Sequence, residues 1–64
     1  MVKVNGESKQ AAGLTVTALL TQEGYDPQKV AVELNEDILP KAKYESTVLQ
    51  EGDAVEIVRF VGGG

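Results

Sequence analysis

One segment in the first half of this 64-residue chain carries apolar residues at helical spacing between a capping residue and a glycine. Val16, Leu19 and Leu20 recur at positions i, i+3 and i+4, which predicts a helix over about residues 15–23. Thr15 is suited to cap its start, and Gly24 to cap its end. A helix this short is marginal by itself, so its apolar face must dock on a sheet supplied by the rest of the chain.

The remaining apolar segments alternate with polar residues, as strands do. Val2 and Val4 precede Asn5-Gly6, a strong hairpin signal, so we expect a first hairpin over about residues 1–12. A strand is predicted over residues 30–34, followed by a turn over 35–37 and a short edge segment at 38–39. Residues 41–45 are expected to be irregular, and 54–61 form the most strand-like stretch.

The predicted order is two strands, one helix and then further strands. We therefore expect an α+β fold of the β-grasp (ubiquitin-like) type, a mixed sheet of about four to five strands around one helix. The chain is expected to form one domain over residues 1–60 and a flexible glycine tail over 61–64. The rings of Tyr25 and Tyr44 are expected at the core edge, with their hydroxyls outward.

Composition excludes several classes of function. The chain has no His and no Cys, which removes the thiolate, imidazole and usual zinc-ligand chemistries. A net charge of −4 opposes binding to nucleic acid. We expect no metal, no membrane insertion and no catalytic residue of its own, and we expect a cytoplasmic protein that is a monomer when free. The scattered carboxylates match no EF-hand loop and are read as a solvated surface.

The last predicted strand carries a candidate docking surface. Alternation places Val55 and Ile57 on one face of this strand. If that face packs on the helix, Val58 and Phe60 lie outward as a small apolar patch for a partner. The alternative is a strand covered on both sides, which would bury Val58 and Phe60 as well.

The chain ends in Gly62-Gly63-Gly64. At a background of about 7% Gly, three in succession at a given place arise by chance about 3 times in 10,000. A segment without side chains fits a narrow channel and brings its carboxylate to a buried reaction centre. A frayed end is the simpler alternative. A carboxylate reacts as an electrophile only after activation, and the chain has no phosphate-binding loop, so a separate enzyme would have to activate it.

These features resemble the thiamine-biosynthesis sulfur carrier proteins (ThiS-like), a family of the ubiquitin-like β-grasp group. The matching blocks are Val4-Asn5-Gly6, Gly13-Leu14-Thr15-Val16 with Leu19-Leu20, Val32-Glu33-Leu34-Asn35, Ile38-Leu39-Pro40-Lys41, Glu51-Gly52-Asp53 and Phe60-Val61-Gly62-Gly63-Gly64. The resemblance implies that the Gly64 carboxylate is adenylated and then converted to a thiocarboxylate. Gly62 and Gly63 would thread into the partner.

The resemblance also implies the partners. They are an E1-like adenylyltransferase (ThiF-like) that uses ATP, a sulfur donor such as a cysteine desulfurase, and a thiazole synthase (ThiG-like) that receives the sulfur. The chain itself is expected to bind no cofactor. Two alternatives stay open: a sulfur carrier of the molybdopterin synthase small subunit type, and a non-covalent β-grasp interaction module. Arg59-Phe60-Val61 lacks the proline-containing approach of the molybdopterin branch.

Overall fold

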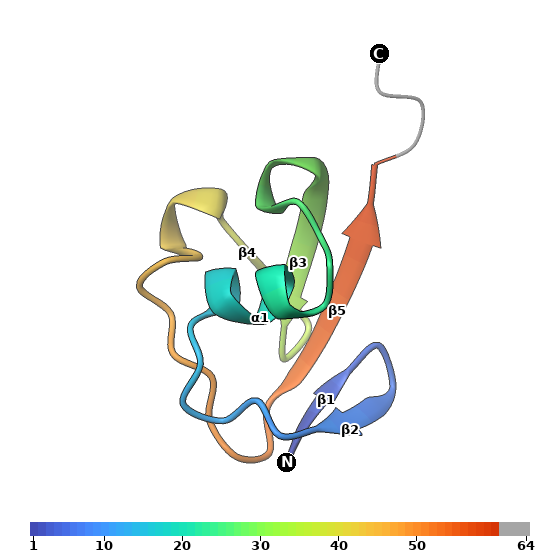
Figure 1. Ribbon diagram of the computed structural model, residues 1–64, viewed down its shortest axis with the longest axis vertical. Coiled ribbons are helices and arrows are strands. Elements are labelled where there is room, and N and C mark those ends of the chain that lie inside the picture. The colour runs from blue at the N-terminus through green and yellow to red at the C-terminus, as the bar shows by residue number, and fades with distance from the viewer. Residues whose placement is uncertain (61–64) are drawn as a thin grey trace.

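The computed structural model describes residues 1–60, in which one helix lies across one face of a five-stranded sheet (Figure 1). The elements, in chain order, are β1 (Val2–Val4), β2 (Glu7–Lys9), α1 (Val16–Gln22), the 3₁₀ helix η1 (Pro27–Lys29), β3 (Val30–Leu34), β4 (Asp37–Leu39), the 3₁₀ helix η2 (Lys41–Lys43) and β5 (Ala54–Arg59).

The sheet is mixed, with strand order β2-β1-β5-β3-β4. β1 and β5 run parallel, whereas the other neighbouring pairs are antiparallel. Two hairpins thus lie on either side of β5, which comes last in the chain and occupies the centre of the sheet. This arrangement confirms the predicted β-grasp fold.

The helix is capped at both ends. Thr15 Oγ1 accepts a hydrogen bond from the Ala18 backbone N–H at 3.1 Å, as predicted for an N-cap. At the other end, Gly24 has a φ of +86°, and the Tyr25 N–H donates to the Leu20 carbonyl at 2.8 Å. This is a Schellman termination, which needs a residue with positive φ.

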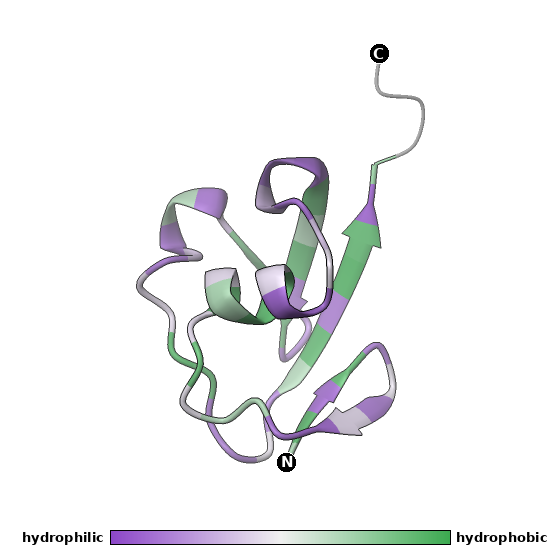
Figure 2. Ribbon diagram, in the orientation of Figure 1, coloured by the Kyte–Doolittle hydropathy of each residue, from purple (hydrophilic) through white to green (hydrophobic). Residues whose placement is uncertain are grey.

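The core lies between α1 and the inner face of the sheet. The helix contributes Val16, Leu19 and Leu20, and β5 contributes Val55 and Ile57. Figure 2 shows the apolar residues along β3 and β5 behind the helix. The other buried members of the cluster are Val2, Val4, Ala11, Val30, Val32, Tyr44 and Leu49.

Four local expectations are corrected by the structure. β2 ends at Lys9 instead of residue 12, because the chain turns inward and buries Ala11 completely. Residues 41–43 form η2, where an irregular segment was expected. β4 begins at Asp37, which had been placed in the preceding turn. β5 ends at Arg59; of the two residues predicted beyond it, Phe60 is outside the strand and Val61 is outside the described residues.

Candidate functional site

The C-terminal end of β5 is fixed by hydrogen bonds up to the last described residue. β5 pairs with β3 over five registered positions, from Leu34 opposite Val55 to Val30 opposite Arg59. One residue further, the Phe60 N–H donates to the Lys29 carbonyl at 3.1 Å. Figure 1 shows that this end of β5 lies at the opposite end of the domain from the N-terminus. The sequence that follows Phe60 therefore starts from an anchored position.

The outer face of the sheet carries the predicted apolar residues. Val58 is 55% exposed and Phe60 58% exposed, whereas Val55 and Ile57 are buried beneath the helix. Ala31, which pairs with Val58 on β3, is half-buried. The exposure of Val58 and Phe60 excludes the alternative in which β5 is covered on both sides within the domain.

A third apolar side chain lies on the same face. Ile38 of β4 is opposite Glu33 of β3 and is 79% exposed, the highest value among the large apolar residues of the described chain. Glu33 is also opposite Glu56 of β5. Two carboxylates directly opposite each other are unfavourable for a sheet, so this acidic pair and its apolar flanks are not explained by the stability of the fold.

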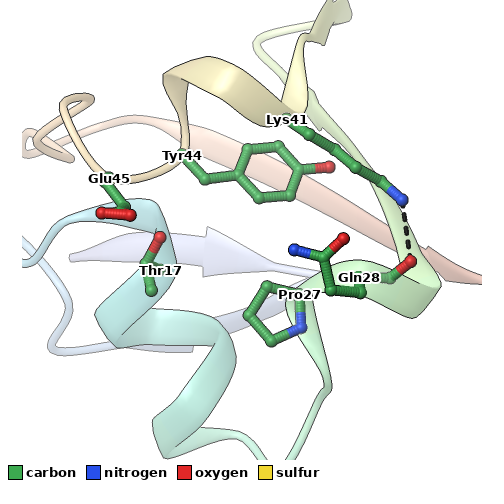
Figure 3. Close-up of a pocket in the computed structure, with 6 residues that line it drawn as sticks. All are labelled: Thr17, Pro27, Gln28, Lys41, Tyr44 and Glu45. Atoms are coloured by element: carbon green, nitrogen blue, oxygen red, sulfur yellow. Dashed lines mark hydrogen bonds between the residues drawn. The ribbon is translucent and has the colours of Figure 1, made fainter.

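Two cations at this end of the sheet are held by aromatic rings. The Arg59 guanidinium carbon lies 4.8 Å from the centroid of the Tyr25 ring, and Lys41 Nζ lies 5.2 Å from that of Phe60. Lys41 Nζ also donates to the Gln28 carbonyl at 2.8 Å (Figure 3). Neither contact could be predicted from the sequence, because each joins residues far apart in the chain and no local pattern links them.

A hollow lies beside this region, between α1, η1 and η2 (Figure 3). Its lining residues are Thr17, Pro27, Gln28, Lys41, Tyr44 and Glu45, and its volume is about 180 Å³. Pockets for small organic ligands usually hold about 300–1,000 Å³. The hollow is therefore too small to be a substrate site of that kind.

Residues 1–60 contain no cluster of His, Cys, Asp and Glu that could hold a metal ion. No helix within this described part is long and apolar enough to cross a membrane. The predicted modification residue, Gly64, and the predicted threading residues, Gly62 and Gly63, lie outside the described residues, as does the whole predicted tail over 61–64.

Comparison with known proteins assigns the family. The sequence profile of the ThiS family matches residues 2–64. The sulfur carrier protein ThiS of Bacillus subtilis is 37% identical over 67 residues, and the alignment covers all of both chains. The crystal structure of the thiamine biosynthesis protein ThiS from Geobacter metallireducens superimposes with a TM-score of 0.76 at 37% identity. That superposition covers 98% of this chain and 97% of the other.

Two longer relatives also match. A thiazole synthase of Paramagnetospirillum magneticum is 48% identical over 62 residues, which are 95% of this chain but only 19% of that protein. A thiazole synthase of Magnetococcus marinus shows 45% identity over 64 residues and 20% coverage of its length. The chain thus spans about one fifth of these two relatives. The names of these relatives refer to ThiS, to thiamine biosynthesis or to thiazole synthase and not to molybdopterin synthase, and the chain belongs to the ThiS family.

Proposed function

We propose that this chain is a protein co-substrate that carries sulfur for thiazole formation in thiamine biosynthesis, and not an enzyme. The observation that carries the proposal is the family match through residue 64, combined with an anchored β5 that leads directly into the glycine sequence. The names of the similar proteins support the same role, since they include sulfur carriers and thiazole synthases.

The proposed chemistry takes place at the Gly64 carboxylate. An E1-like (ThiF-like) enzyme would catalyse attack of this carboxylate on the α-phosphorus of ATP, which forms an acyl adenylate and releases pyrophosphate. A sulfur nucleophile from a donor such as a cysteine desulfurase then displaces AMP from the carbonyl carbon. If that nucleophile is a persulfide, its S–S bond must next be reduced by a thiol. The resulting thiocarboxylate delivers sulfur to a thiazole synthase (ThiG-like).

The division of labour follows from what the chain lacks. It has neither His nor Cys and no phosphate-binding loop, so the nucleotide, the metal and the electrostatic stabilisation must come from the activating enzyme. Gly62 and Gly63 would pass through the partner's channel because they carry no side chain. Since the reaction needs ATP, we place it in the cytoplasm.

The outer face of β5 is the proposed docking surface. Val58 and Phe60 expose apolar area next to the tail, and burying that area against a partner is favourable. Because this surface directly precedes residues 61–64 in the sequence, it also limits the distance between the docking contact and the reacting carboxylate.

The test is the intact mass of the protein after incubation with ATP, a sulfur donor and the activating enzyme. The control is a variant with one residue added after Gly64. We expect the parent chain to gain the mass difference between sulfur and oxygen, and the extended variant to show no gain and an unchanged circular dichroism spectrum. An unchanged parent, with an enzyme active on another carrier, would favour the non-covalent module.

A further inference from the structure

Three cationic residues lie at the end of the sheet that leads to Phe60, the last described residue. Arg59 is the last residue of β5, and its partner in β3, Val30, directly follows Lys29. Lys41 reaches the same end from η2, since its Nζ contacts the Gln28 carbonyl and lies over the Phe60 ring. We call Lys29, Lys41 and Arg59 the basic collar. All three residues are exposed.

The contacts that position the collar do not neutralise its charge. Within residues 1–60, no carboxylate lies within 4.0 Å of any of its charged groups, and the ion pairs found there involve Lys9 and the N-terminus. Lys41 and Arg59 are held instead by aromatic faces and a backbone carbonyl. Such contacts orient a cation but leave its full charge available to another group.

The collar contrasts with the rest of the molecule. It carries a charge of +3 in a chain of net charge −4, so the remaining residues carry −7. Asp26, three residues before Lys29, caps η1 by accepting from the Gln28 N–H at 2.9 Å. The acidic turns at 35–37 and 50–53 lie toward the other end of the sheet, as Figure 1 shows. The end of the domain that holds Phe60 therefore carries three cations that form no ion pair within the described residues.

We propose that the basic collar docks on a ring of acidic side chains around the mouth of the activating enzyme's channel. This inference rests on the proposed function. Electrostatic complementarity of this kind chiefly accelerates and orients encounter. The collar would attract the tail end of the domain to the acidic mouth, while the acidic remainder of the domain would be repelled.

The alternative occupant is the phosphate chain of ATP, and distance argues against it. Four extended residues span at most about 14 Å, which is the reach from Phe60 to the reacting carboxylate in a threaded complex. A Lys side chain, with its stem of four carbons, extends far less than this. The collar would therefore remain at the entrance of the channel, where it meets the partner's surface and not the nucleotide at the far end of the tail.

The experiment uses the full chain and the E1-like enzyme from the same genome. Initial rates of ATP–pyrophosphate exchange are measured against carrier concentration, at roughly 0.05 M and 0.5 M NaCl, because salt at the higher level screens surface charges. The variants are Lys29→Glu and Lys29→Glu/Lys41→Glu. Lys29→Arg retains the charge, and Lys3→Glu makes the same charge change on β1, at the other end of the domain. Circular dichroism melting checks that every variant folds.

We expect Lys29→Glu to raise the KM for the carrier several-fold at low salt, and the double variant to raise it about tenfold or more. The kcat should not change, and the differences should shrink at high salt. Lys29→Arg and Lys3→Glu should match the parent chain. Equal effects of Lys3→Glu and Lys29→Glu would overturn the proposal, as would an unchanged KM. A change confined to the KM for ATP would overturn it in favour of the nucleotide.

The outcome for the collar is separable from the outcome for the proposed function. If the parent chain supports no exchange with an enzyme active on another carrier, the proposed function fails and the collar proposal fails with it. If the parent chain is adenylated normally and the collar variants behave like Lys3→Glu, only the collar proposal fails.

Discussion

Two turn asparagines stabilise β5 through their side chains. Asn5, at a φ of +50°, accepts from the Ile57 N–H at 2.7 Å and donates to the Ile57 carbonyl at 3.3 Å. Asn35, at +52°, accepts from the Ala54 N–H at 2.9 Å. The Asn5 amide contacts β5 at Ile57, beyond the last position at which the short β1 pairs with β5. Each hairpin thereby satisfies backbone groups of the central strand through one side chain.

Replacing Asn5 tests this contribution. Asn5→Gly keeps the positive φ but loses both hydrogen bonds to Ile57 and the long one to the Tyr25 hydroxyl, so we expect the free energy of unfolding to fall by about 1–2 kcal/mol. Asn5→Ala also strains the backbone and should cost about 1 kcal/mol more. Urea denaturation followed by circular dichroism measures both. A glycine variant as stable as the parent would show that the amide contributes nothing to the stability of β5.

Tyr44 is buried, contrary to the expectation of an outward hydroxyl. Its side chain belongs to the core, and its hydroxyl donates to the Val30 carbonyl at 3.4 Å. Tyr25 is closer to the expectation, since its ring is half-buried and its hydroxyl accepts from Asn5 Nδ2 at 3.5 Å. Composition could not distinguish the two residues, because the burial of Tyr44 depends on the path of residues 41–48 over the core.

Burial raises the pKa of the Tyr44 phenol above its usual value near 10, although the Val32 backbone partly opposes the shift. The unfolded phenol then ionises at lower pH than the folded one, so this group's contribution to stability is constant below about pH 10 and falls as pH rises further. We expect Tyr44→Phe to weaken the alkaline loss of stability, measured by urea denaturation between about pH 8 and 11.

The hydrogen bond and ion pair with Glu23 raise the pKa of Lys9 above its usual value near 10.5. The contribution of Lys9 to stability therefore also falls as the pH rises above about 10.5. A Lys9→Met background removes this second contribution and isolates that of Tyr44. If Tyr44→Phe has the same alkaline profile as its background, Tyr44 does not titrate differently in the two states.

At the level of elements, the two hairpins use the same turn with different residues. Asn5-Gly6 and Asn35-Glu36 both have positive φ at their two central positions, as a type I′ turn requires, but Glu36 adopts a φ of +72°. Asn-Gly is the preferred pair for this turn. The second hairpin is therefore strained at one residue where the first is not.

Exchanging the residue types between the turns tests this difference. Glu36→Gly should raise the free energy of unfolding by about 0.5–1 kcal/mol, because the strain of an L-residue exceeds the entropic cost of glycine. Gly6→Glu should lower it by a similar or larger amount. A Cβ at Gly6 would meet no atom within 4 Å, so its cost comes from the backbone alone. Thermal melting of both variants gives the signs, and a destabilised Glu36→Gly would contradict the argument.

The elements with a clear local signal could be predicted, and those without one could not. The spacing of Val16, Leu19 and Leu20 predicted α1, alternation predicted β3, and strand propensity predicted β5. η1 and η2 are single turns of 3₁₀ helix, too short to repeat an apolar pattern. The contacts at their ends define them. Strand order and register also needed the structure, since the parallel pairing of β1 with β5 joins the two ends of the chain.

At the level of the whole molecule, the two faces of β5 differ, since Val55 and Ile57 are buried in the core and Val58 is exposed. The orientation of Val58 and Phe60 followed from alternation once the inner face was fixed. The basic collar did not follow, because it combines residues from β5, η1 and η2. Sequence reasoning thus predicted the exposure of Val58 and Phe60, but not the charged groups that the fold gathers beside them.

Two valines on the same strand provide the last test. Threonine retains the branched shape that strands favour. Val55→Thr and Val58→Thr therefore differ only in whether the new hydroxyl lies on the inner or the outer face of the sheet. Val55→Thr buries this group in the core and should lower the free energy of unfolding by about 1–2 kcal/mol. Val58→Thr should change it by less than about 0.5 kcal/mol.

Function should show the reverse order. Because Val58 contributes exposed apolar area beside the tail, Val58→Thr should raise the KM for the carrier in the adenylation assay without changing kcat, whereas folded Val55→Thr should behave like the parent chain. Measuring both variants below their melting temperatures separates loss of docking from loss of fold. Equal KM values for Val58→Thr and the parent chain would remove Val58 from the docking surface.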